Sequence, residues 1–170
     1  MASQLTVDNI VGATSSDKIH IPGHVIQAVS SYTGVKTTVT STTFVDVTDL
    51  SVTITPTSST SKILILFNGH GGHDNTNYFL WNIVRNSTSI AQPAGGNYAA
   101  TMNAYTGDNV SNGFAIQSVG MNFLDSPATT SATTYKIQVA TTGNTAILNG
   151  RPGNANGQTI SSLTVMEIAQ

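Results

Sequence analysis

Residues 50–55 are Leu-Ser-Val-Thr-Ile-Thr, an unbroken alternation of apolar and hydroxyl side chains. A period of two places Leu50, Val52 and Ile54 on one face of an extended chain, as in a β-strand whose other face meets water. Residues 134–139 and 35–40 repeat the pattern, which directs six further side chains toward a core: Tyr135, Ile137, Val139, Val35, Thr37 and Val39. Helical periodicity is nearly absent and β-branched residues recur throughout, so the sequence predicts an all-β protein.

Two stretches differ from this pattern because they are apolar on both faces, Ile63–Phe67 and Tyr78–Arg85. The outer face of a strand in a monomeric two-sheet sandwich normally meets water, so a second apolar face requires a cover. Another subunit would supply that cover, and so would a long loop of the same chain folding back over the sheet. We favour the subunit, and we therefore expect an oligomer.

Clusters of Gly, Pro, Asn and Ser separate the apolar runs and predict turns at 21–23, 56–59, 68–72 and 149–154. The region Ile90–Asn112 is rich in Gly, Asn, Ala and Tyr and is predicted to be a long surface excursion, where binding loops tend to lie. Roughly eight to ten short strands separated by such turns indicate an antiparallel β-sandwich of the jelly-roll type.

The chain changes character at about residue 22. Residues 1–22 hold two short apolar tracts around a turn and are too few to form a domain, so we expect an N-terminal arm held by a partner or a neighbouring subunit. Residues 23–170 are expected to form one jelly-roll domain. The apolar side chains expected to dock the arm on its partner are Leu5, Val7, Ile10, Ile19 and Ile21.

Charge is scarce, since Asp, Glu, Lys and Arg make up 8% of the chain against about 25% in ordinary soluble domains. The six basic residues are scattered and the net charge is −2, so no nucleic-acid partner is expected. Cysteine is absent, which excludes disulfides and thiolate chemistry. Without an apolar run of about 18 residues no membrane insertion is expected, and residues 1–8 lack the basic and apolar regions of a signal peptide.

Catalytic motifs are not recognisable, because the sequence has no Gly-x-Ser-x-Gly elbow, no thiol nucleophile and no phosphate-binding loop with its lysine. We therefore expect a protein that is not an enzyme and needs no cofactor. Glycan hydrolysis would need two carboxylates about 5–10 Å apart, and Asp46 and Asp49 are close enough in sequence to be considered. Turn and capping roles explain both residues equally well.

Histidines supply the candidate metal ligands. His70, His73 and Asp74 in a Gly-rich stretch have the side chains that zinc or nickel prefers, although a polar loop is the interpretation we favour. His20 and His24 flank Pro-Gly, and in a trimer one histidine per chain near the axis could assemble a three-imidazole site. Histidines hydrogen-bonded where a strand begins are the simpler interpretation, so no metal is expected.

Aromatic residues are the candidates for contact with sugar rings. Trp81 lies in a predicted strand and is assigned to the core, whereas Tyr98 and Tyr105 lie in the long excursion. Together with His70, His73 and Asn75 of the Gly-rich stretch, Tyr98 and Tyr105 are the candidate residues for contact with an outside surface.

Several segments carry a resemblance that composition does not reveal. Ile19–Gln27 and Leu50–Ile65 are similar to small tail-fibre-like proteins of tailed bacteriophages. Phe123–Lys136 and Leu163–Ile168 resemble the same family, and the opening Leu5–Ile10 is similar to the short N-terminal motif that such proteins often carry. The similar segments are spread over most of the chain, from about Leu5 to Ile168, but none of them lies within residues 69–120.

This resemblance implies a virion structural protein, a homotrimeric jelly roll made in the cytoplasm of a bacterial host. Such domains tip tail fibres that meet the host surface, and similar trimers decorate capsids. We expect a short tail-fibre or receptor-contacting trimer attached by its N-terminal arm, although the chain lacks an extended shaft. A capsid decoration (cement) trimer is the alternative, and a glycan depolymerase is a weaker one. The expected partners are further copies of the chain, other virion proteins of the tail or capsid, and a host-surface glycan.

Overall fold

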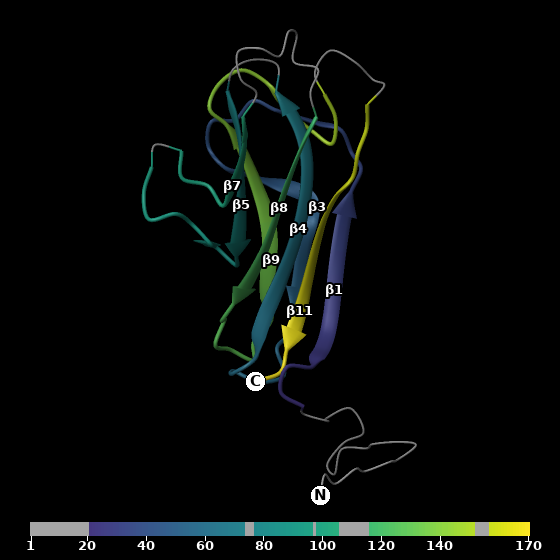
Figure 1. Ribbon diagram of the computed structural model, residues 1–170, viewed down its shortest axis with the longest axis vertical. Coiled ribbons are helices and arrows are strands. Elements are labelled where there is room, and N and C mark those ends of the chain that lie inside the picture. Colours follow the sequence, from purple (N-terminus) through teal and green to yellow (C-terminus); the bar gives the residue numbers. More distant parts are fainter. Residues whose placement is uncertain (1–20, 74–76, 97, 106–115, 152–156) are drawn as a thin grey trace, which may run out of the picture.

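The computed structural model describes residues 21–73, 77–96, 98–105, 116–151 and 157–170 of the 170-residue chain. These residues form eleven β-strands and contain no helix, so no helix among them could cross a membrane. The strands pair antiparallel throughout and build two sheets that face each other (Figure 1). The predicted all-β, antiparallel fold is confirmed, with the packing of a β-sandwich.

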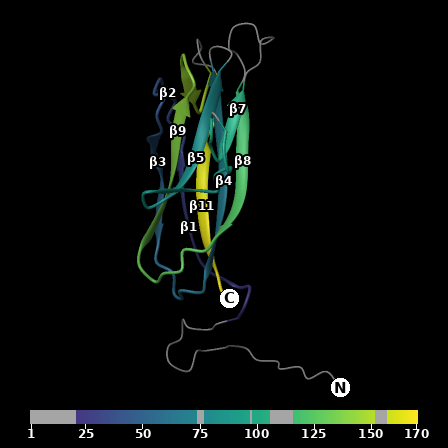
Figure 2. The ribbon, with the colours of Figure 1, turned by 90° about the vertical axis from the view of Figure 1, so that its left-hand side faces the viewer.

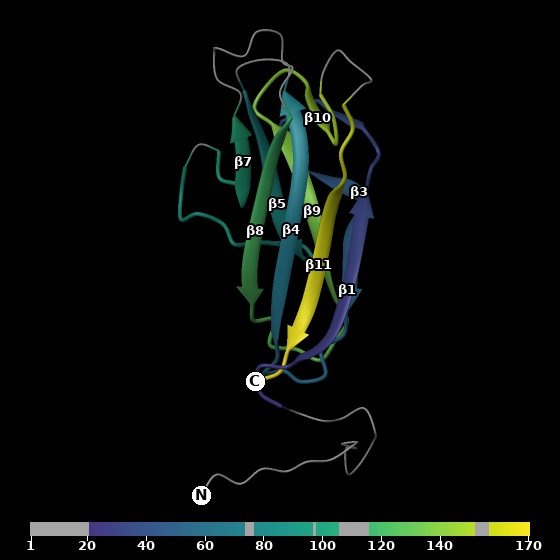
Figure 3. The same ribbon diagram turned by 45° about the vertical axis from the view of Figure 1, so that its right-hand side comes forward.

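The first sheet is built around the long strand β4, with β11 and then β1 on one side and β8 on the other (Figure 3). Beyond the beginning of β11, the short strands β10 and β2 continue the sheet along β4. The bounds are β1 Val25–Thr33, β2 Thr37–Val39, β4 Lys62–His73, β8 Gln117–Asp125, β10 Ala146–Leu148 and β11 Ser161–Ile168.

The second sheet has the order β3-β9-β5, and two short strands share the remaining edge of β5. β6 pairs with the end of β5, and β7 pairs with its beginning. The bounds are β3 Val45–Ile54, β5 Tyr78–Arg85, β6 Thr88–Ile90, β7 Met102–Tyr105 and β9 Thr133–Thr141.

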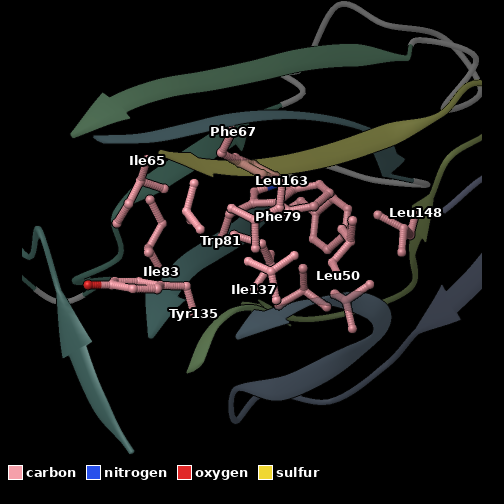
Figure 4. Packing of buried hydrophobic residues seen from close by; sticks show 14 of the residues in the cluster. Leu50, Ile65, Phe67, Phe79, Trp81, Ile83, Tyr135, Ile137, Leu148 and Leu163 are labelled. Carbon is pink, nitrogen blue, oxygen red and sulfur yellow. The ribbon is translucent and has the colours of Figure 1, made fainter. Parts of the chain in front are cut away.

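A single apolar core fills the space between the sheets (Figure 4). Trp81 is completely buried at its centre, and its ring centroid lies 5.6 Å from that of Phe67 and 4.6 Å from that of Phe79. The alternation at 50–55 and 134–139 is confirmed, because every apolar residue of these two runs is buried. The third alternating run was predicted wrongly in part: Val35 is exposed, since it precedes the short strand β2, and in that strand only Val39 is buried.

The turn predicted at residues 68–72 is wrong, because β4 continues through this stretch to His73. Gly69 and Gly71 have a packing role instead of a turn role. A Cβ atom at Gly69 would lie 2.5 Å from the ring of Phe67, and one at Gly71 would collide with the ring of Phe79. The glycines therefore leave room for the aromatic side chains of the core.

The second apolar face of β5 is covered by the protein's own chain, so the expectation of a subunit over this strand is wrong. Leu80 is buried against Ala100, a residue of the segment between β6 and β7. Asn82, also on the outer face, donates to Ser89 Oγ over 2.9 Å and accepts a hydrogen bond from Gln92. In Figure 3 the chain leaves the region where β6 pairs with the end of β5, bows outward and returns to β7. It is the first part of the predicted excursion Ile90–Asn112, folded back over the sheet, whereas β7 occupies the next part and residues 106–112 lie outside the described residues.

Asp125 joins the two sheets at the end of β8. Its carboxylate accepts two hydrogen bonds from the guanidinium of Arg85, over 2.8 and 2.9 Å, and one from the hydroxyl of Tyr135, over 2.7 Å. Asp125 belongs to the first sheet, while Arg85 and Tyr135 belong to β5 and β9 of the second. Burial, reinforced by the neighbouring carboxylate, raises the pKa of Tyr135 far above its usual value, so its hydroxyl remains a proton donor.

A second buried carboxylate, Glu167 on β11, fastens the connection between β3 and β4. It accepts hydrogen bonds from Thr57 N over 2.7 Å, Thr57 Oγ1 over 2.8 Å and Gln27 Nε2 over 2.6 Å. Burial alone would raise the pKa of Glu167, but the hydrogen bonds from Gln27 and Thr57 outweigh it and hold the pKa below its usual value of 4.5.

The beginning and the end of the described chain lie side by side at one end of the sandwich. Gly23 N donates to Ala169 O over 2.8 Å, and Ala169 N donates to His24 O over 2.9 Å. Of the arm residues, Ile21 is exposed at this end, whereas Leu5, Val7, Ile10 and Ile19 lie outside the described residues.

Candidate functional site

Three tyrosines form a partly exposed cluster on the second sheet. Tyr78 begins β5 and pairs across the strands with Tyr105 at the end of β7, and their ring centroids are 4.7 Å apart. Tyr98, from the segment that covers the sheet, lies 5.2 Å from Tyr78 on the same measure. Tyr98 is 52% exposed and Tyr105 43% exposed, while Tyr78 is half-buried between them.

A groove of about 290 Å³ adjoins this cluster, and we call it the Tyr98 groove. Leu80 contributes from the sheet and packs with Phe44 in the small outer cluster of apolar side chains. The described part of the lining mixes apolar and hydroxyl groups without a charged side chain; its residues are Thr42, Phe44, Leu80, Tyr98, Ala99, Thr141 and Thr142.

Backbone and side-chain hydrogen bonds fix the walls of the groove. Tyr78 N donates to Thr142 Oγ1 over 3.0 Å, and Thr142 N donates to Tyr78 O over 3.1 Å. Thr141 N donates to Ser41 O over 2.8 Å, which holds the chain before β3 against the end of β9. Ile83 N donates to Thr101 Oγ1 over 3.0 Å and so ties the covering segment to β5. The site is therefore built on strands as well as on a loop.

The tyrosine cluster lies at the opposite end of the sandwich from the paired chain ends. β5 runs away from the cluster toward the end where the C-terminus lies, and β7 runs toward the cluster (Figure 1, Figure 3). The view turned by 90° agrees, with β7 and the C-terminus at opposite ends of the long axis (Figure 2). A molecule held at its chain ends would therefore present the tyrosines outward.

The two histidines of the Gly-rich stretch do not converge. His73 is 1% exposed, and its Nε2 lies 2.7 Å from Thr141 Oγ1 in the interior, so the expectation that it contacts a host surface is wrong. His70 is half-buried on the other face of β4, with Nδ1 2.7 Å from Ile160 O. In the described parts of the chain, no three side chains gather that could hold a metal ion; Asp74 and Asn75 lie outside those parts.

Of the two carboxylates considered for hydrolysis, Asp46 is engaged in an ion pair and a further hydrogen bond. Asp46 accepts hydrogen bonds from Lys136 Nζ and Gln138 Nε2, each over 2.7 Å, and these bonds, Lys136 first, lower its pKa. Asp49 is exposed at a φ of 70°, where the pairing of β3 with β9 shifts register. A second hollow, of about 210 Å³ between β2 and β3, is lined by Asp46 but not by Asp49.

Sequence reasoning selected Tyr98 and Tyr105 but missed Tyr78, Thr42 and Thr142. Tyr78 carried a usable signal, since it begins a two-faced strand and its outer side chain needs neighbours. The threonines carried none, because threonine is frequent along the whole chain and only the folded structure distinguishes these two. His24 is exposed close to the chain ends, and His20 lies outside the described residues.

Comparison with known proteins leaves the site to be interpreted from its geometry. No protein family model and no curated protein matches this chain.

Proposed function

We propose that the protein is a bacteriophage virion structural protein, a short tail-fibre or receptor-contacting trimer attached to the particle by its N-terminal arm. The observation that carries this proposal is the partly exposed tyrosine cluster at the end of the sandwich opposite the paired chain ends. This polarity suits a protein that is anchored at one end and makes contact at the other. The segment resemblance to small tail-fibre-like proteins points to the same role.

Jelly-roll connectivity is part of the proposal. Its support is a nested pairing of the eight strands β1, β3, β4, β5, β7, β8, β9 and β11. In chain order the first pairs with the last, the second with the seventh, the third with the sixth and the fourth with the fifth. Rolling up one long antiparallel hairpin of eight strands gives this pattern, and it distributes the strands as β1-β11-β4-β8 and β3-β9-β5-β7.

The trimer is supported by the outer face of the first sheet. Leu124, Leu64, Met166 and Ala28 lie in one row across β8, β4, β11 and β1, since each pairs with the next in the strand register. Leu124 is 53% exposed, and the row carries no charge. An apolar row of this kind favours contact with another protein surface, which in our proposal is a neighbouring copy.

A capsid decoration trimer is the second candidate, because the same apolar row would equally suit contact with subunits of a shell. Sedimentation and binding experiments on the purified full chain separate these proposals. We expect a trimer at micromolar concentration that binds host bacteria and does not bind assembled shells. A stable monomer would refute the trimer, and binding to shells but not to cells would favour the decoration role.

A further inference from the structure

We infer that the Tyr98 groove binds an uncharged pyranose ring, the terminal sugar of a surface glycan. This inference rests on the proposed receptor-contacting function and names the class of ligand for it.

Tyr98 provides a stacking surface that is already held in place. Its ring packs against Tyr78 at an interplanar angle of 36°, and Tyr78 in turn packs against Tyr105 at 35°. An aromatic face that keeps its orientation loses little conformational entropy when a ligand binds. The aliphatic C–H face of a pyranose is apolar enough to cover such a ring, and half of the Tyr98 surface remains exposed to receive it.

The hydroxyl groups of Thr42, Thr141 and Thr142 also line the groove, and they suit the hydroxyls of a sugar. Each threonine hydroxyl can donate one hydrogen bond and accept others, as each sugar hydroxyl can. Thr141 is engaged inside the protein, with His73 Nε2 at 2.7 Å and Gly143 O at 2.6 Å. Thr42 is exposed, and its hydroxyl is the one that we assign to the ligand.

The charge and size of the groove restrict the ligand further. Among the described residues no lysine or arginine lines it, so an acidic sugar would lose water around its carboxylate without gaining a cation. A volume of about 290 Å³ lies at the lower limit of the roughly 300–1,000 Å³ typical of small-molecule sites, which suits a single ring. The ligand class is therefore a neutral hexose or N-acetylhexosamine.

Binding is tested with the full chain and a panel of methyl glycosides of neutral hexoses and N-acetylhexosamines, with glucuronic acid as the acidic probe. Saturation-transfer NMR reports contact, and titration gives the dissociation constant. We expect at least one neutral glycoside to bind and glucuronic acid not to bind. Tyr98→Ala should weaken binding about fivefold or more, and Tyr98→Phe should leave it within about twofold of the unmodified chain.

Two further variants separate a local effect from a general one. Tyr32→Ala removes a tyrosine that is 71% exposed on the other sheet, so it should leave sugar binding unchanged. Thr42→Val leaves the tyrosine cluster intact and should weaken binding about threefold through loss of one hydrogen bond. The inference is overturned if no neutral glycoside binds, if glucuronic acid binds as well as the neutral sugars, or if Tyr98→Ala retains full binding.

Whole-cell binding by the same preparations distinguishes failure of the sugar site from failure of the receptor-contacting function. If the chain binds bacteria but no neutral glycoside competes, the sugar site is wrong while the receptor-contacting function stands. If a neutral glycoside binds in the groove but the chain binds no host cells, the sugar site stands and the receptor-contacting function is wrong.

Discussion

Replacing Asp125 with alanine is expected to destabilise the fold strongly, because Asp125 is the buried acceptor that connects the two sheets. The change removes three charge-assisted hydrogen bonds at once. It leaves the hydroxyl of Tyr135 buried without that acceptor, which costs about 1–3 kcal/mol. Breaking a fully buried ion pair costs about 3–5 kcal/mol, but the Arg85 side chain is 29% exposed, and water can solvate part of its charge.

Together these terms suggest a loss of about 3 kcal/mol from a total stability of about 5–15 kcal/mol. At a denaturant slope of about 2 kcal/mol per M, the urea midpoint should fall by about 1.5 M. Trp81 is the only tryptophan and is completely buried, so its fluorescence follows unfolding of the core directly.

Two control variants sharpen this measurement. Lys136→Ala breaks the exposed ion pair with Asp46 and should change the free energy of unfolding by less than about 1 kcal/mol. The double variant Asp125→Ala, Tyr135→Phe should cost less than the sum of the two single variants, because the orphaned hydroxyl is removed as well. A loss below about 1 kcal/mol for Asp125→Ala alone would refute the view that this residue clamps the sheets.

Three further predictions concern the core, the pH dependence and the arm. Gly71→Ala should lower the free energy of unfolding by about 1–3 kcal/mol in urea titrations, because the new Cβ collides with the ring of Phe79. Gly120→Ala is the control and should be nearly neutral, since its new Cβ would have its nearest neighbour, Phe67 O, at 3.4 Å. Because the pKa of Glu167 is lowered in the folded state, its carboxylate stabilises the fold fully above pH 4.5, and this stabilisation is lost as the pH falls through the folded-state pKa. Glu167→Gln should therefore be less stable at neutral pH. Its stability should also depend less on pH in acid unfolding followed by circular dichroism. An unaltered acid profile would contradict this. Deleting residues 1–18 should leave the circular dichroism spectrum and the oligomer unchanged, because no described strand begins before Val25. The same deletion should abolish attachment to the particle in a sedimentation assay. Normal attachment would exclude the arm as the anchor.

The sequence predicted the fold class because period-two alternation is a local property that the folded chain preserves. Leu50 and Tyr135 are buried as that pattern requires. Val35 is exposed because it precedes β2, which begins at Thr37. Alternation alone does not indicate where a strand begins, so the sequence placed Val35 in the core. Glycine misled the prediction at 68–72, since a glycine that permits a turn and a glycine that admits an aromatic ring look alike in sequence.

The cover over β5 could not be predicted, because a two-faced strand indicates that a cover exists without indicating its source. The residues that supply it, Gln92 and Ala100, lie in the Gly-, Asn- and Ala-rich excursion, whose composition predicts a loop but not the surface that the loop covers. The candidate site was predicted in part, because aromatic residues in a long excursion are few enough to select. His73 was selected for its residue type alone, and its burial depends on β4 extending further than the glycines suggested.

Locating the protein by cryo-electron microscopy of the intact particle tests the proposed function most directly. Our account predicts a small number of three-fold symmetric copies on the tail, with the chain ends toward the particle and Tyr98 facing outward. Hundreds of copies spread over the head, with the tyrosine end pressed against shell subunits, would contradict it.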